Sequence, residues 1–119
     1  MLPSSLVGLY QTFEQQVEEL RSLALAANPD PLRVQESFIK AQQHFQTHIA
    51  TSGVAIAPEY EPMVQSIQVE INKQLRLLAM DVMYLQTARQ AMTTQRRQAQ
   101  MGDRLQLLQT YCQNLLGSA

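Results

Sequence analysis

The chain has 119 residues and a formal net charge of −1, contains a single cysteine and no tryptophan, and is 45% hydrophobic. A chain of this length buries roughly two thirds of the surface that its unfolded form exposes, so we expect one domain over residues 1–119 with one hydrophobic core. A net charge near zero gives no overall attraction to nucleic acid or to an anionic membrane, and a single cysteine excludes an internal disulfide.

The first predicted helix begins after Pro3, where Ser4 or Ser5 can act as the N-cap. Apolar residues then recur every three or four positions, as on one face of an amphipathic helix. They are Leu6, Leu9, Phe13, Val17, Leu20, Ala24 and Ala27. This helix is expected to stop in the segment 28–31, because its two prolines lack the amide donors that a helix interior requires.

The second predicted helix starts in the same segment, since Asp30 followed by Pro31 is typical of an N-cap and a first helical position. Its apolar face carries Val34, Phe38, Ala41, Phe45 and Ile49. The helix is expected to fade through residues 51–53. The short turn before it implies that the first two helices are antiparallel neighbours.

The third predicted helix follows a connection from Gly53 to Pro62 and runs without glycine or proline to about Met92. Roughly 30 residues at 1.5 Å each give a helix of about 45 Å, longer than the others. Glu59 and Glu61 suit its N-terminus, where the helix dipole favours acids. Its main apolar stripe is Val64, Ile67, Ile71, Leu75, Leu78, Val82 and Leu85.

A break in the apolar phase separates the third helix from a fourth. The new stripe is Met101, Leu105, Leu108, Cys112 and Leu115. The break predicts a turn around residues 93–98, with Thr93 or Thr94 as the cap of the fourth helix and Gly117 at its end. The sequence therefore predicts an all-α, antiparallel bundle of about four helices with a long third helix.

Side chains that could carry chemistry are few. His44 and His48 have the spacing of two metal ligands on one helix, but no cluster of carboxylates completes the set, so we interpret them as residues at the edge of the core. Cys112 lies on a buried stripe, where a thiol is usually unreactive. No phosphate loop, nucleophile elbow or carboxylate pair is present, and we expect no enzymatic activity, metal, cofactor or small-molecule substrate.

Charge is distributed unevenly along the chain. Residues 1–72 hold eight acids and three bases, whereas residues 73–119 hold two acids and six bases. This asymmetry suits either the choice of neighbours among antiparallel helices or the pairing of subunits, and both remain open. Arg89, Arg96, Arg97 and Arg104 form a possible basic patch, but no aromatic residues alternate with them as in single-strand binders. We interpret them as solvated and expect no nucleic-acid partner.

The most informative feature is a second apolar stripe on the third helix. With the main stripe at 0°, Leu77, Met80 and Tyr84 fall at about 180° to 240°, on the opposite side. One hypothesis is an interaction face of the helix-on-helix, coiled-coil type. Its rim would be Lys73, Arg76 and Arg89 or Asp81. The alternative is that packing within the monomer covers these residues.

Residues 71–90, with the sequence INKQLRLLAMDVMYLQTARQ, resemble the most recognisable segment of the PatD family, the cyanobacterial heterocyst-frequency control proteins. The tail is similar to that family through RQAQM at 97–101 and DRL at 103–105. The N-terminal half matches only in helix pattern and length. Tyr84 stands where the family pattern has an aromatic residue like phenylalanine, a mild departure that adds a hydroxyl.

The resemblance implies a regulator that acts on the assembly of FtsZ, the tubulin-like division protein, and influences how many cells become heterocysts. The alternative is a structural or adaptor bundle that forms a homodimer through its third helix. The N-terminal residues lack the pattern of a signal peptide and no stretch is apolar enough to span a bilayer, so we expect a cytoplasmic protein and no membrane partner.

Overall fold

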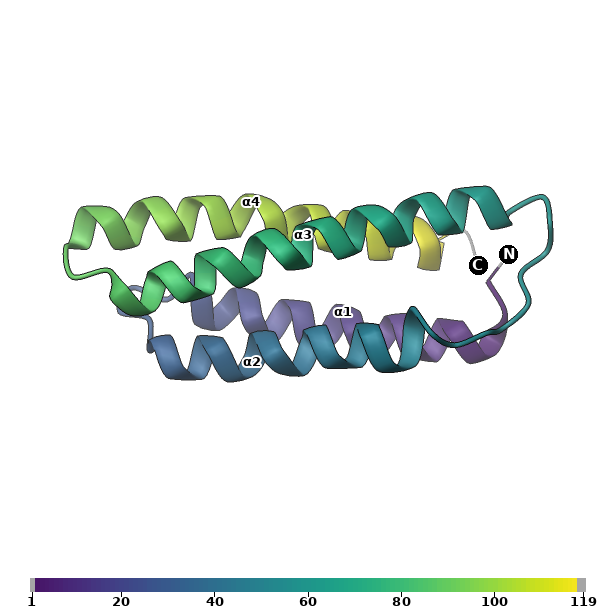
Figure 1. The fold of residues 1–119 in the computed structure, drawn as a ribbon, viewed down its shortest axis with the longest axis horizontal. Coiled ribbons are helices and arrows are strands. Elements are labelled where there is room, and N and C mark those ends of the chain that lie inside the picture. Colours follow the sequence, from purple (N-terminus) through teal and green to yellow (C-terminus); the bar gives the residue numbers. More distant parts are fainter. Residues whose placement is uncertain (1, 118–119) are drawn as a thin grey trace.

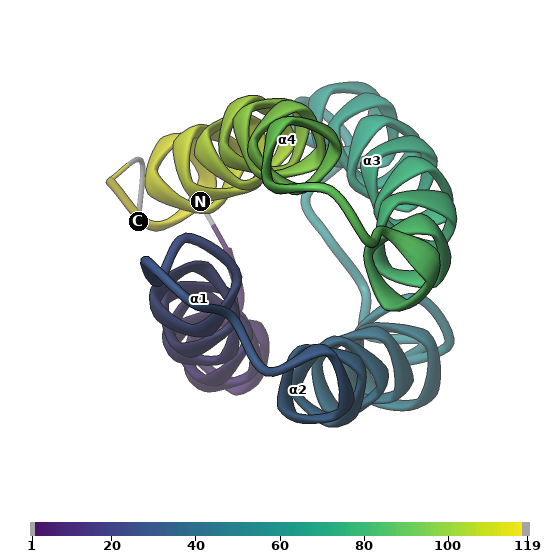
Figure 2. The same ribbon diagram turned by 90° about the vertical axis from the view of Figure 1, so that its left-hand side faces the viewer.

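The chain folds into an antiparallel helical bundle (Figure 1), seen in a computed structural model that describes residues 2–117. The elements are α1 (Ser4–Ala24), α2 (Pro31–His44) with a π-helical continuation η1 (Phe45–Ile49), α3 (Glu61–Thr87) and α4 (Ala91–Gly117). Residues 2–117 contain no strand. α1 and α3 stand at opposite corners, each packed against both α2 and α4 (Figure 2). The predicted all-α bundle of four helices is confirmed.

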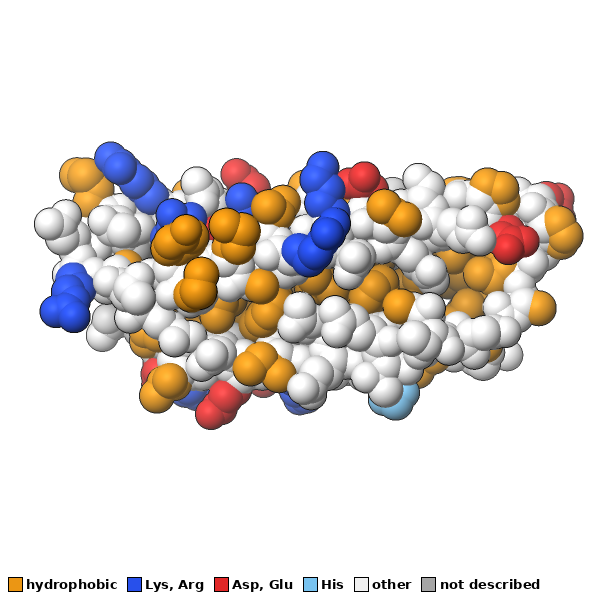
Figure 3. Space-filling model, viewed as in Figure 1, with side chains coloured by type: hydrophobic (Ala, Val, Ile, Leu, Met, Phe, Trp, Pro, Cys, Tyr) orange, Lys and Arg blue, Asp and Glu red, His pale blue; other side chains and the backbone are white. Residues whose placement is uncertain are grey.

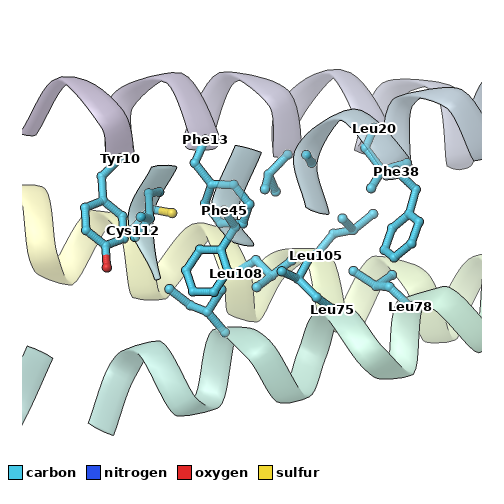
Figure 4. Close-up of a cluster of buried hydrophobic side chains, with 14 of the residues drawn as sticks. Tyr10, Phe13, Leu20, Phe38, Phe45, Leu75, Leu78, Leu105, Leu108 and Cys112 are labelled. Atoms are coloured by element: carbon cyan, nitrogen blue, oxygen red, sulfur yellow. The ribbon is translucent and has the colours of Figure 1, made fainter. Parts of the chain in front are cut away.

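The bundle measures 49 × 19 × 19 Å along its principal axes, and its core fills the space between the four helices. The aromatic rings of Phe13 and Phe45 pack with their centroids 5.4 Å apart, and Leu75 and Leu108 complete the same cluster (Figure 4). The core also includes Tyr10, which the stripe predicted for the first helix omits. The Tyr10 hydroxyl accepts a hydrogen bond of 3.1 Å from the Gln68 amide of α3, so its polar atom has a partner.

The start of α2 matches the prediction, and its end does not continue as a regular α-helix. The Asp30 carboxylate accepts a 3.1 Å hydrogen bond from the Leu32 amide, which makes it the N-cap. At the other end, the Ala50 amide donates to the Phe45 carbonyl five residues earlier, at 2.8 Å. Phe45 and Ile49 nevertheless stay buried, and Gly53, with φ of 65°, turns the chain toward α3.

The ends of α1 differ from the prediction. The helix begins at Ser4 with Pro3 in the N-cap position and no side-chain capping bond, so the expected serine cap is wrong. It ends at Ala24, and Ala27 is exposed outside the helix. The Gln98 side-chain amide of α4 donates to the carbonyls of Ala24 at 2.9 Å and Ala26 at 2.7 Å. A residue distant in sequence thus satisfies the open end of α1.

The turn between α3 and α4 also lies elsewhere than predicted. α3 ends at Thr87 rather than near Met92, and α4 begins at Ala91, so Thr93 and Thr94 lie inside α4 and neither caps it. The Thr87 hydroxyl donates to the Tyr84 carbonyl at 3.0 Å, a local bond that competes with the helix ladder. α3 and α4 both have 27 residues, so α3 is not longer than all its partners.

We expect the substitution Asp30→Ala to lower the free energy of unfolding by about 1 kcal/mol, because it removes the N-cap of α2. Urea denaturation monitored by circular dichroism measures this loss. Asp103→Ala is the matched control, since Asp103 is exposed within α4 and caps no helix. Equal stability of Asp30→Ala and the unsubstituted protein would contradict the capping role.

Candidate protein-interaction surface

α3 packs on the core with one face and leaves another face to solvent, because its neighbours α2 and α4 cover only its flanks (Figure 2). The inner face consists of the main-stripe residues, which recur every three or four positions. Between residues 71 and 85, each main-stripe residue is at most 3% exposed. Those positions are Ile71, Leu75, Leu78, Val82 and Leu85. Any apolar side chain on the opposite side of α3 therefore has no place in this core.

The second stripe is largely uncovered. Met80 is 49% exposed and Tyr84 is 41% exposed, whereas Leu77 is half-buried. Met83, which the sequence analysis left out, is 56% exposed. We name these four residues the outer α3 face. Hydrophobic side chains gather over the C-terminal half of α3 in the space-filling view (Figure 3). The alternative that the bundle itself seals Met80 and Tyr84 is thus wrong.

Met83 could have been found from the sequence. It lies at about 120° from the main stripe, between the outer stripe and the flank toward α2, and thus outside the predicted sector from 180° to 240°. The three expected cations around the face, Lys73, Arg76 and Arg89, are all exposed. Their charged groups are free to reach solvent or a partner.

Asp81 is not on the rim of this face, contrary to expectation. Its side chain is only 1% exposed, and it pairs with Arg97 and Arg104 of α4. Arg97 Nη1 lies 3.4 Å from one carboxylate oxygen, and Arg104 Nη1 donates to the other. On the helical wheel Asp81 points sideways, and α4 packs on that side and buries it. The interpretation of Arg97 and Arg104 as solvated surface residues is wrong for the same reason.

Arg97 links the buried Asp81 carboxylate to the outer α3 face. Its guanidinium carbon lies 4.2 Å from the centroid of the Tyr84 ring, a cation–π arrangement. It also donates to the Gln100 side chain at 3.2 Å. Asp81, Gln100 and Tyr84 therefore all contact the Arg97 guanidinium. This contact favours one orientation of the exposed Tyr84 ring.

His44 and His48 line a shallow, open hollow on α2 and η1 that Gln16 of α1 borders. His44 Nε2 is 2.9 Å from the Leu9 carbonyl, which only accepts, so this nitrogen carries the proton. The rings of His44 and His48 contact each other with centroids 5.3 Å apart. Within residues 2–117, no three of the His, Cys, Asp and Glu side chains gather closely enough to hold a metal ion. His44 serves the packing of α2 on α1.

Cys112 is buried in the core between α1 and α4, as the sequence predicts (Figure 4). Burial raises the pKa of its thiol from 9.0 to about 12, and the charge of Glu14 adds to the shift. Burial likewise raises the pKa of Tyr10 to about 12, although the hydrogen bond from Gln68 acts in the opposite direction. Both groups are neutral at physiological pH.

Comparison of the chain with models of protein families, with curated proteins and with solved structures gives no match. Across the described part of the chain, no helix combines the length and the apolar character needed to cross a membrane.

We expect the double substitution Arg97→Met, Arg104→Met to lower the free energy of unfolding by about 3–5 kcal/mol, because it leaves the buried Asp81 carboxylate without a counter-ion. Adding Asp81→Asn to this background should restore part of the loss, since the unpaired charge is then removed. Urea denaturation of the double and triple variants measures the coupling. A triple variant less stable than the double variant would contradict a buried ionic link.

We expect the Cys112 thiol of the folded protein to react with Ellman's reagent at pH 8 about a thousandfold more slowly than in the unfolded chain, since only the thiolate attacks. A fast reaction of the folded protein would contradict the burial of Cys112.

The raised pKa of Cys112 also makes the free energy of unfolding depend on pH. Unfolding releases the Cys112 proton between pH 9.0 and about 12, so the free energy of unfolding falls as pH rises through this interval and is unaffected by Cys112 below it. Cys112→Ala should reduce the slope of the free energy of unfolding against pH in this interval.

Proposed function

We propose that this chain is a regulatory protein that catalyses no reaction and acts by holding a protein partner on the outer α3 face. The observation that carries the proposal is the exposure of Met80, Met83 and Tyr84, at 49%, 56% and 41%. Their spacing of i, i+3 and i+4 places them on one side of a single helix. Methionine and tyrosine offer large contact areas that adapt to a partner and tolerate water when unbound.

The proposed partner is FtsZ, and the proposed role is control of FtsZ assembly and of heterocyst frequency in the cytoplasm of a cyanobacterium. This assignment derives from the resemblance of residues 71–90 to the PatD family. That segment contains the whole outer α3 face, so the part of the chain that carries the resemblance also carries the exposed apolar residues. A shared binding surface would explain why the two coincide.

We expect the purified protein, at micromolar concentrations, to change the mass or bundling of polymers that FtsZ forms with GTP. Met80→Asp should weaken this effect about tenfold, because it places a charge in the centre of the contact. Sedimentation and light scattering measure polymer mass and bundling. Leu25→Asp is the control, since Leu25 is 39% exposed at the end of α1, close to Gly102 of α4 and outside the outer α3 face. Both variants are first compared with the parent protein by thermal unfolding.

Unchanged FtsZ polymers in the presence of the parent protein would overturn the proposal. Solution mass at several protein concentrations then identifies the alternative. A dimer that dissociates on Met80→Asp, together with unaltered FtsZ polymers, would assign the outer α3 face to a second copy and the protein to the structural or adaptor class.

A further inference from the structure

We infer that the segment held on the outer α3 face is an acidic amphipathic helix of the partner protein. This inference rests on the proposed function and adds the chemistry of the partner. The observations behind it are the charges around the face, which have no ion-pair partners among residues 2–117 except through Asp81, and the contact of Tyr84 with Arg97.

A further exposed apolar side chain lies at the start of α4. Met92, which is 64% exposed, follows the turn that joins the two helices. The Met92 sulfur lies 3.9 Å from Nη2 of the exposed Arg96. At this end of the bundle, hydrophobic and basic side chains lie next to each other on the surface (Figure 3). A partner that covers the methionines therefore also meets the arginines.

The charges that surround this surface are mostly of one sign. Its exposed cations are Lys73, Arg76, Arg89 and Arg96. From residue 71 to residue 117 the acids are Asp81, which is buried, and Asp103. The single charge of Asp81 faces two guanidinium groups, so the buried cluster itself retains one positive charge in excess. The side chains of Arg97 and Arg104 are 30% and 24% exposed, and this excess lies close to the surface.

The acidic half of the chain does not neutralise these cations. In residues 2–117, the ion pairs join Lys40 to Glu19 and Arg97 and Arg104 to Asp81, so none links the two halves. Glu59 and Glu61 lie at the start of α3, before the basic surface, and Glu70 lies three residues before Lys73 but forms no ion pair with it. A partner that covers the positive rim is therefore favoured if it brings acids, since complementary charges at an interface favour the right partner.

A second copy of the chain fits this surface poorly. In a symmetric dimer the same patch meets itself, so the cations of one rim would face those of the other. Like charges brought together at an interface are unfavourable. Contact between this surface and the acidic start of α3 in another copy needs an antiparallel pairing centred near the middle of α3, which places Met80, Met83 and Tyr84 away from the two-fold axis rather than against each other. Charge thus favours a different molecule with acidic residues.

The shape of the surface favours a helical partner. The residues Met80, Met83 and Tyr84 lie along one turn of an exposed helix, where the apolar positions of a second helix can lie alongside at the same spacing. Tyr84 is already oriented by Arg97, so less conformational freedom is lost on binding. The methionines adapt to the remaining contour. Asp and Glu on both sides of the partner's apolar stripe would reach Arg76 and Arg89.

The test uses a fluorescent peptide with leucines at helical spacing flanked by glutamates, and a matched peptide with lysines in their place. We expect the full chain to bind the glutamate peptide at least about tenfold more tightly at low salt, and added salt to reduce the difference. Charge reversal by Arg76→Glu with Arg89→Glu should weaken binding of the glutamate peptide about tenfold and leave folding intact. Arg33→Glu is the control, because Arg33 is an exposed cation of α2.

Equal affinity for the two peptides, or no effect of the charge reversal, would overturn the inference. Binding to phosphatidylserine vesicles in preference to the glutamate peptide would overturn it in favour of a lipid surface. The same charge-reversed protein is also tested on FtsZ polymers. If the parent protein changes the polymers and the charge-reversed protein does so equally, the inference fails while the proposed function stands. If the parent protein has no effect on the polymers but binds the glutamate peptide selectively, FtsZ is the part that fails.

Discussion

The ionic contact between Asp81 of α3 and two arginines of α4 determines how the second half of the bundle is arranged. Removing a carboxylate from water is unfavourable unless counter-ions and hydrogen bonds replace the lost solvation, so the buried Asp81 requires Arg97 and Arg104. Arg104 also donates to the Leu77 carbonyl at 3.2 Å. These bonds fix the position of α4 along α3, which apolar contacts alone specify only loosely.

The same contact shapes the surface on which both proposals depend. Arg97 reaches from Asp81 to the ring of Tyr84, so a buried charge orients an exposed aromatic side chain. Because two arginines share one carboxylate, positive charge remains next to the exposed methionines. An apolar face with a basic border differs from a nucleic-acid site, where aromatic side chains would alternate with the cations. It suits a protein segment that supplies both apolar and acidic side chains.

Glutamine side chains provide much of the remaining specificity between helices. Gln98 binds the carbonyls at the end of α1, and Gln68 binds the hydroxyl of the buried Tyr10. Gln109 accepts from Arg21 at 2.9 Å and donates to Glu18. Satisfied polar contacts of this kind favour one register over others, because a shifted helix would leave buried polar atoms without partners. The glutamines of this sequence thus bear on how the helices are aligned.

The sequence alone determined the helices and their inner faces, because apolar residues at a spacing of three or four identify the side of a helix that avoids water. It also identified Met80 and Tyr84 as apolar residues opposite the core. Only the tertiary structure decided where α3 ends, which side of it α4 covers, and hence that Asp81 is buried. Its partners lie 16 and 23 residues later in the chain, and the periodicity of one helix contains no information about a side chain on another.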